Sequence, residues 1–73
     1  MKKKEFRILI ESIGFYGTNK FNYYYKGFEI YLYNNYYFYK DSEWIYYYYN
    51  DLTPLENYFK KDMRSYKLKQ LLR

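Results

Sequence analysis

The chain has 73 residues, which suffice for a single small domain with a limited hydrophobic core. It contains no cysteine and no histidine, so disulfides, cysteine or histidine metal ligands and histidine-based proton transfer are excluded. The formal net charge is +5, and no apolar run approaches the roughly 20 residues that a membrane-spanning helix needs.

The first segment predicts an amphipathic helix over residues 3–13, because its apolar residues recur at helical spacing. The apolar stripe consists of Phe6, Leu9, Ile10 and Ile13. Gly14 follows as a natural C-terminal cap, since glycine enters the left-handed region without strain. Residues 15–20 are predicted to form a loop.

Tyrosine dominates the middle of the chain, where a β-meander is predicted. Twelve of the 15 tyrosines lie between Tyr23 and Tyr49, and a ring with a polar tip suits a half-buried sheet. A/T-rich codon usage is an alternative source of part of this excess. The predicted strands are 21–25, 28–33, 36–40 and 43–49.

The register of the meander follows from its turns, which are predicted to have two residues each, at 26–27, 34–35 and 41–42. This register places Glu29 beside Lys40 and Lys40 beside Glu43 in one charged ladder. Phe28, Ile30 and Leu32 then lie on the opposite face, which the helices cover. A change of one residue in any loop would exchange the faces of every later strand.

The exit from the sheet carries a capping box, Thr53-Pro54-Leu55-Glu56, which predicts a helix over 54–64. The apolar periodicity slips beyond Arg64, so a break near Ser65 and a short helix over 66–72 are preferred to one helix with two apolar sides. The predicted fold is a single α+β domain, residues 1–73, with the order α-β-β-β-β-α and both helices mainly on one face of a four-stranded antiparallel sheet.

No residue pattern predicts catalysis. The serines lie outside any nucleophile motif, and the glycine spacing matches no phosphate-binding loop. Four acids could in principle bind Mg²⁺, but structural roles are preferred because two flank Lys40 and two lie in turns. The four acids are Glu29, Asp41, Glu43 and Asp51. We expect a non-enzymatic protein without a metal or a cofactor.

The sheet face away from the helices is the predicted protein-binding site. Its residues are Tyr31, Tyr33, Tyr36, Phe38, Tyr47 and Tyr49. Four strands of about seven residues give this face on the order of 400 Å², and tyrosine is enriched at interface hot spots. Two alternatives remain: self-association as a structural or virion component, and coverage of the face by residues 15–20 or 66–73.

Nucleic-acid binding is another alternative, because residues 53–73 carry six basic residues against two acidic ones. The basic residues predicted to contact phosphates are Lys60, Lys61, Arg64, Lys67 and Lys69. A solvated helix face explains the same charges. The predicted aromatic face carries one lysine and two glutamates, so it offers phosphates no positive groove.

Short length, A/T-biased composition and the lack of catalytic groups resemble the features of orphan accessory proteins of viruses and other mobile elements. Charged residues interrupt the segment where a signal peptide would be apolar, so a cytoplasmic location is expected. The predicted function is to bind, and thereby block, a host protein that the sequence does not identify.

Overall fold

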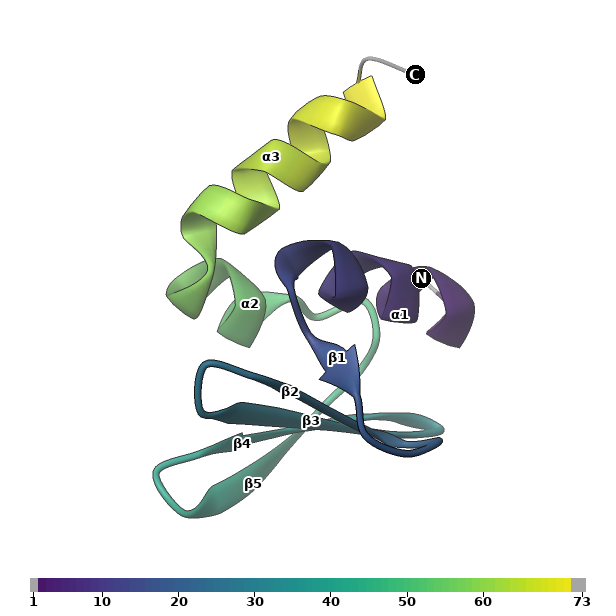
Figure 1. Cartoon of the computed structure of the whole chain (residues 1–73), viewed down its shortest axis with the longest axis vertical. Coiled ribbons are helices and arrows are strands. Elements are labelled where there is room, and N and C mark those ends of the chain that lie inside the picture. The colour runs from purple at the N-terminus through teal and green to yellow at the C-terminus, as the bar shows by residue number, and fades with distance from the viewer. Residues whose placement is uncertain (1, 72–73) are drawn as a thin grey trace.

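The computed structural model describes the backbone of residues 2–71 and the side chains of residues 2–65, and it confirms an α+β fold with helices at both ends (Figure 1). The sheet has five antiparallel strands in sequential order rather than the predicted four. The elements are α1 (Lys3–Ile13), β1 (Tyr16–Gly17), β2 (Asn22–Tyr25), β3 (Phe28–Tyr33), β4 (Asn35–Lys40), β5 (Glu43–Tyr47), α2 (Thr53–Tyr58) and α3 (Lys60–Leu71).

The additional strand, β1, lies within the segment predicted to be a loop. Tyr16 pairs with Tyr24 of β2, and Gly17 pairs with Tyr23. The side-chain oxygen Oδ1 of Asn19 accepts hydrogen bonds from the backbone N–H groups of Phe21 and Asn22, at 2.9 and 3.0 Å. These local bonds close the tight connection that brings β1 back against β2.

The helices lie on one side of the sheet. Figure 1 shows α1 and α2 above it, with α3 extending away toward the C-terminus. The opposite side carries no helix in the described part of the chain, and residues 66–71 continue α3 away from it. The described residues therefore do not support the alternative in which the C-terminal segment covers that face, although residues 72 and 73 lie outside the description.

α1 spans the predicted residues, and the four residues of its apolar stripe are all buried. Gly14 ends the helix with φ of +134°, and its N–H donates to the carbonyl of Ile10 at 3.2 Å. The stripe packs against the sheet, where the ring of Phe6 stacks on the ring of Tyr36. Burial of this apolar stripe is what holds α1 on the sheet.

Two of the three predicted turns are confirmed. Residues 26–27 and residues 41–42 each form a two-residue turn with positive φ at both positions, the conformation that matches the twist of the flanking strands. Tyr25 consequently pairs with Phe28, and Lys40 pairs with Glu43.

The second turn is shorter than predicted, and the register that depended on it is wrong. Asn34 alone, with φ of +60°, lies between Tyr33 and its partner Asn35. Asparagine tolerates this left-handed conformation better than most residues. Each residue of β4 and β5 therefore lies on the face opposite to the predicted one.

The charged ladder predicted from this register is only half formed, because Lys40 pairs with Glu43 but not with Glu29. Glu29 pairs with Tyr39 on the face away from the helices, whereas Lys40 and Glu43 lie on the helix side. The observed register instead pairs Leu32 with Tyr36 and Ile30 with Phe38. Phe38 has no hydroxyl to satisfy, so its burial stabilises this register at no hydrogen-bonding cost.

The C-terminal helices break at a different place from the one predicted. The break falls at Phe59, with φ of −132°, and α3 continues through Ser65. The ring of Phe59 is buried within 6 Å of the rings of Phe15, Tyr25 and Phe28. This break turns α3 away from the body of the molecule (Figure 1).

The predicted capping box at Thr53 is replaced by a related arrangement. Thr53 is the first helical residue, and the Asp51 carboxylate accepts hydrogen bonds from both its N–H, at 3.1 Å, and its hydroxyl, at 2.5 Å. These bonds hold the pKa of Asp51 below its usual value. Asp51 thus satisfies a donor at the helix start that would otherwise depend on water.

Candidate protein-binding surface

The six residues predicted to bind a protein do not share one face. Tyr31 and Tyr33 lie on β3, on the face away from the helices. The others follow the second turn, and the shorter loop moves them to the helix side. Tyr36, Phe38 and Tyr49 are buried in the core, and Tyr47 is half-buried beside them.

Four residues that the predicted register would have placed on the helix side, Tyr37, Tyr39, Trp44 and Tyr46, take their place. Together with Tyr24, Tyr31 and Tyr33, they form what we call the outer aromatic surface. This surface consists of Tyr24, Tyr31, Tyr33, Tyr37, Tyr39, Trp44 and Tyr46. Trp44 and Tyr46 remain 46% and 44% exposed, and Tyr33 is 55% exposed.

The rings of this surface pack on one another. Around Tyr31, the ring centroids of Tyr33, Tyr37 and Trp44 lie at 6.4, 6.2 and 6.5 Å. These four residues line a shallow, open hollow. Because aromatic neighbours restrict each ring, little side-chain entropy remains to be lost when a partner binds.

Two further contacts extend the packing to the neighbouring rings. Tyr37 lies 5.0 Å from Tyr46, and Tyr39 lies 4.9 Å from Trp44, each across the β4–β5 pair. Asn35 fixes the end of this row, since its Nδ2 donates to the Tyr46 hydroxyl at 2.9 Å while its Oδ1 accepts from the N–H of Tyr49. The surface is preorganised on strands rather than on loops.

The outer aromatic surface is almost uncharged. Glu29 is the one charged residue among the strand positions of this face. Its carboxylate accepts a hydrogen bond from Asn22 Nδ2 at 2.7 Å. A hydrogen bond with Glu29 also raises the pKa of Tyr24. Because no strand position of this face carries a lysine or an arginine, its centre offers phosphate groups no counter-charge.

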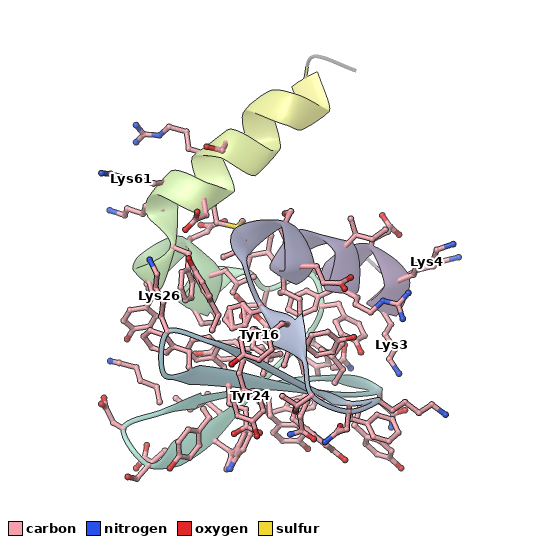
Figure 2. The ribbon with its side chains drawn as sticks, viewed as in Figure 1. Lys3, Lys4, Tyr16, Tyr24, Lys26 and Lys61 are labelled. Atoms are coloured by element: carbon pink, nitrogen blue, oxygen red, sulfur yellow. The ribbon has the colours of Figure 1, made fainter. Side chains whose placement is uncertain are left out.

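The basic residues lie on the helix side of the molecule. Lys60, Lys61 and Arg64 are exposed on α3, as the nucleic-acid alternative requires, while the side chains of Lys67 and Lys69 lie outside the described residues. The structure adds Lys26, from the β2–β3 turn, which lines one hollow with Lys60 and Lys61. Figure 2 shows Lys26 and Lys61 on one side of the molecule and Lys3 and Lys4 on the other.

The described part of the chain has neither a metal-binding cluster nor a membrane-spanning helix. No three acidic residues lie close enough together to hold a metal ion. No helix is long and apolar enough to cross a membrane. The acids expected to have structural roles include Asp51, which accepts hydrogen bonds from Thr53 at the start of α2, and Asp41, whose carboxylate lies 3.2 Å from Lys40 Nζ.

Comparisons with known proteins returned no matching family model, no matching curated protein and no matching solved structure. Two features of the described chain could contact a macromolecule: the outer aromatic surface, and the hollow lined by Lys26, Lys60 and Lys61, which we call the basic hollow and which Asp62 also lines. These two features are the basis on which a function is proposed.

Proposed function

We propose that this chain is a small non-enzymatic module that binds another protein through the outer aromatic surface. The observation that carries the proposal is a sheet face of seven aromatic residues, six of them in ring contact with one another, with no helix over it in the described chain. Tyrosine and tryptophan are the residues most enriched at interface hot spots, because they bring a large contact area with few rotatable bonds.

The electrostatics of the surface favour a protein over a nucleic acid. Its strand positions carry Glu29 and the amides of Asn22 and Asn35 but no cation. Two lysines, Lys3 and Lys20, lie over the ring of Phe21, which borders the surface beside Tyr31. The hollow around Tyr31 is shallow and open, whereas small-molecule sites bury most of their ligand. A flat, neutral, aromatic face with polar tips is typical of the centre of a protein–protein interface.

A matched pair of variants tests this proposal. The first, Tyr37→Ser with Trp44→Ser, removes two rings from the outer aromatic surface. The second, Tyr58→Ser with Ile8→Ser, removes two exposed apolar side chains on the helices, outside the surface. Both variants should retain the circular dichroism spectrum of the unchanged protein, because none of the four residues is fully buried.

Each tagged protein is used to capture partners from cells that naturally contain the chain, and the captured protein is then purified and titrated by calorimetry. We expect the Tyr37/Trp44 variant to lose at least tenfold in affinity and the control to keep it, since each hot-spot ring contributes 2 kcal/mol or more. Equal affinity of both variants would end the proposal. Loss of the partner's own activity on binding would support the blocking role expected from composition.

A second candidate function rests on the basic hollow. Lys26, Lys60 and Lys61 line it together with the half-exposed ring of Tyr58, and Lys40 Nζ lies 4.6 Å from the centroid of that ring. Hydrogen bonds with Tyr58 and with the Asp41 carboxylate raise the pKa of Lys40, which keeps it charged. Cations around an exposed ring are typical of single-stranded nucleic-acid binding.

Fluorescence anisotropy with a single-stranded RNA oligonucleotide tests the second candidate. The logarithm of the binding constant should fall linearly with the logarithm of salt concentration. Lys26→Gln with Lys61→Gln should reduce the magnitude of this slope by about 1.4, since each contact with a phosphate of a single strand contributes about 0.7. Lys3→Gln with Lys4→Gln, which removes equal charge at the other side of the molecule, should leave the slope unchanged. A flat salt response would rule this function out.

A further inference from the structure

β5 presents an unprotected edge. Within the described chain this strand pairs with β4 alone, and Glu43 to Tyr46 are all exposed. Natural edge strands are protected by short length, lysine, proline or a bulge. β1, at the other edge, is only two residues long, but β5 has five residues, no proline and one charged residue, at its start.

The direction of the backbone groups along β5 follows from its turn. Asp41 and Ser42 have φ values of +52° and +64°, so the turn is a two-residue primed type flanked by the pair Lys40 and Glu43. The two residues that flank such a turn form a hydrogen-bonded pair. Along an antiparallel ladder, hydrogen-bonded pairs alternate with pairs whose N–H and C=O groups point away from each other. The N–H and C=O groups of Trp44 and Tyr46 therefore point outward, to the free edge.

We propose that two copies of the chain pair antiparallel through β5, around a twofold axis at Ile45. Ile45 is the middle residue of the strand, so this register overlaps the whole of it. Trp44 then pairs with the partner's Tyr46, and every outward backbone group of these two residues finds a complement. This intermolecular strand pair resembles the β-strand addition by which many sheets bind extended chains.

The side chains are compatible with the same register. Ile45 faces the partner's Ile45, which buries an aliphatic side chain that is 43% exposed in one copy. Glu43 lies opposite the partner's Tyr47, so the two carboxylates stay at opposite ends of the strand pair. A register centred on Glu43 would instead place like charges directly opposite each other, which is destabilising.

The net charge of +5 does not oppose this pairing, because its sources lie elsewhere. The exposed basic residues of α3 extend from the side of the sheet opposite to the outer face, as Figure 1 shows for the helix itself. At the β5 end of the sheet, Lys40 is paired with Asp41 at 3.2 Å. Repulsion between helices is therefore screened by distance and by salt.

Pairing at this edge would also widen the proposed binding surface. Trp44 and the partner's Tyr46 would lie side by side on the outer face, so two outer aromatic surfaces would join into one. The pairing itself does not depend on the proposed function, since it rests on the backbone of β5. A partner protein would, however, meet a twofold-symmetric surface.

Sedimentation velocity over a wide concentration range tests the proposal with charge-swapped variants. Ile45→Lys and Ile45→Glu each place like charges on the twofold axis, on a side chain exposed enough to keep the monomer folded. We expect a concentration-dependent dimer for the unchanged chain, monomers for each variant alone, and a dimer again in their equimolar mixture. Rescue by mixing is specific to a residue that faces its own counterpart.

Hydrogen exchange adds a second measurement on the same proteins. The amides of Trp44 and Tyr46 should be protected in the unchanged chain and lose protection in Ile45→Lys, while the amide of Ile45 stays protected in both. A monomer at every concentration would overturn the proposal. So would a dimer that persists in Ile45→Lys but is lost in Tyr33→Ser, which would indicate face-to-face packing of the outer aromatic surfaces.

Discussion

The ring of Tyr36 stacks on the ring of Phe6, with a centroid distance of 4.3 Å and an interplanar angle of 27°. Phe6 lies on α1 and Tyr36 on β4, so the contact fixes the first helix on the sheet. The hydroxyl of Tyr36 also donates to the backbone carbonyl of Asp51, on the approach to α2. One buried tyrosine thus connects the sheet with both helical parts of the chain.

Adjacent tyrosines should therefore differ sharply in their effect on stability. We expect Tyr36→Ala to lower the free energy of unfolding by about 3–5 kcal/mol, because it leaves a cavity in the core. Tyr37→Ala should cost less than about 1 kcal/mol, since that ring lies on the outer aromatic surface. Urea denaturation measures both. The reverse order would indicate a two-residue second turn.

Two buried hydroxyls give a second matched comparison. Tyr36→Phe should cost about 1 kcal/mol, because it removes the hydrogen bond to the Asp51 carbonyl. The Tyr49 hydroxyl is buried without a hydrogen-bond partner among the described residues, so Tyr49→Phe should stabilise the fold by about 1 kcal/mol. The melting temperatures of the two variants should move in opposite directions. Destabilisation by Tyr49→Phe would show that its hydroxyl has a partner.

The ionisation of Tyr36 should make the fold sensitive to alkali. Burial, followed by the nearby Asp51 carboxylate, raises the pKa of Tyr36 above its ordinary value of 10.0. The unfolded chain releases this proton near pH 10 but the folded chain retains it, so the stabilisation is present below pH 10 and is lost as the pH rises above it. We expect the free energy of unfolding to fall beyond pH 10, with Tyr36 contributing at most about 1.4 kcal/mol per pH unit.

Urea titrations at several pH values between 8 and 11 measure this decline. Tyr36→Phe has no proton to release at that position, so its curve should be shallower than that of the unchanged chain. Some decline should remain, because burial also raises the pKa of Tyr49. Parallel curves for the two proteins would contradict the assignment to Tyr36.

The glycines provide a test of steric contact at the end of α1. A Cβ atom at Gly14 would lie 2.7 Å from Cε1 of Tyr25, whereas a Cβ at Gly27 would meet nothing within 4 Å. Both residues have positive φ, so alanine is strained at both, by about 1–2 kcal/mol. Gly14→Ala should cost clearly more than Gly27→Ala in thermal denaturation, and equal costs would mean that Tyr25 moves aside freely.

Local signals in the sequence determined the elements themselves. The helical spacing of α1 and the glycine that follows it predicted the helix at its observed position, and two of the three turns were predicted with the correct length. Each of these features depends on residues close together in the chain, so it can be predicted from the sequence without knowledge of the tertiary structure. The sites predicted upstream of the second turn, Tyr31 and Tyr33, consequently lie on the outer face.

The residues around Asn34 and Asn35 could not decide the length of the second turn. Either asparagine tolerates the left-handed conformation. Side chains also alternate between the two faces of the strands in the same way whether the turn has one residue or two. One residue nevertheless indicated the correct register. Phe38 is the one phenylalanine of the sheet that follows this turn, and only the observed register places its ring in the core. The break at Phe59 has the same origin, in a ring that fits an aromatic cluster assembled from distant residues.

Sequence alone therefore determined most of the helices and strands, β1 and the helix break at Phe59 excepted, because backbone propensity, capping and turn chemistry act over a few residues. Only the tertiary structure decided which side of β4 and β5 faces the helices. That choice is made by the burial of Tyr36 and Phe38 under α1 and α2, a free energy that arises only when distant segments meet. Because Tyr36 and Phe38 face the helices, their neighbours along β4 and β5 lie on the other face, where Tyr37, Trp44 and Tyr46 stay partly exposed.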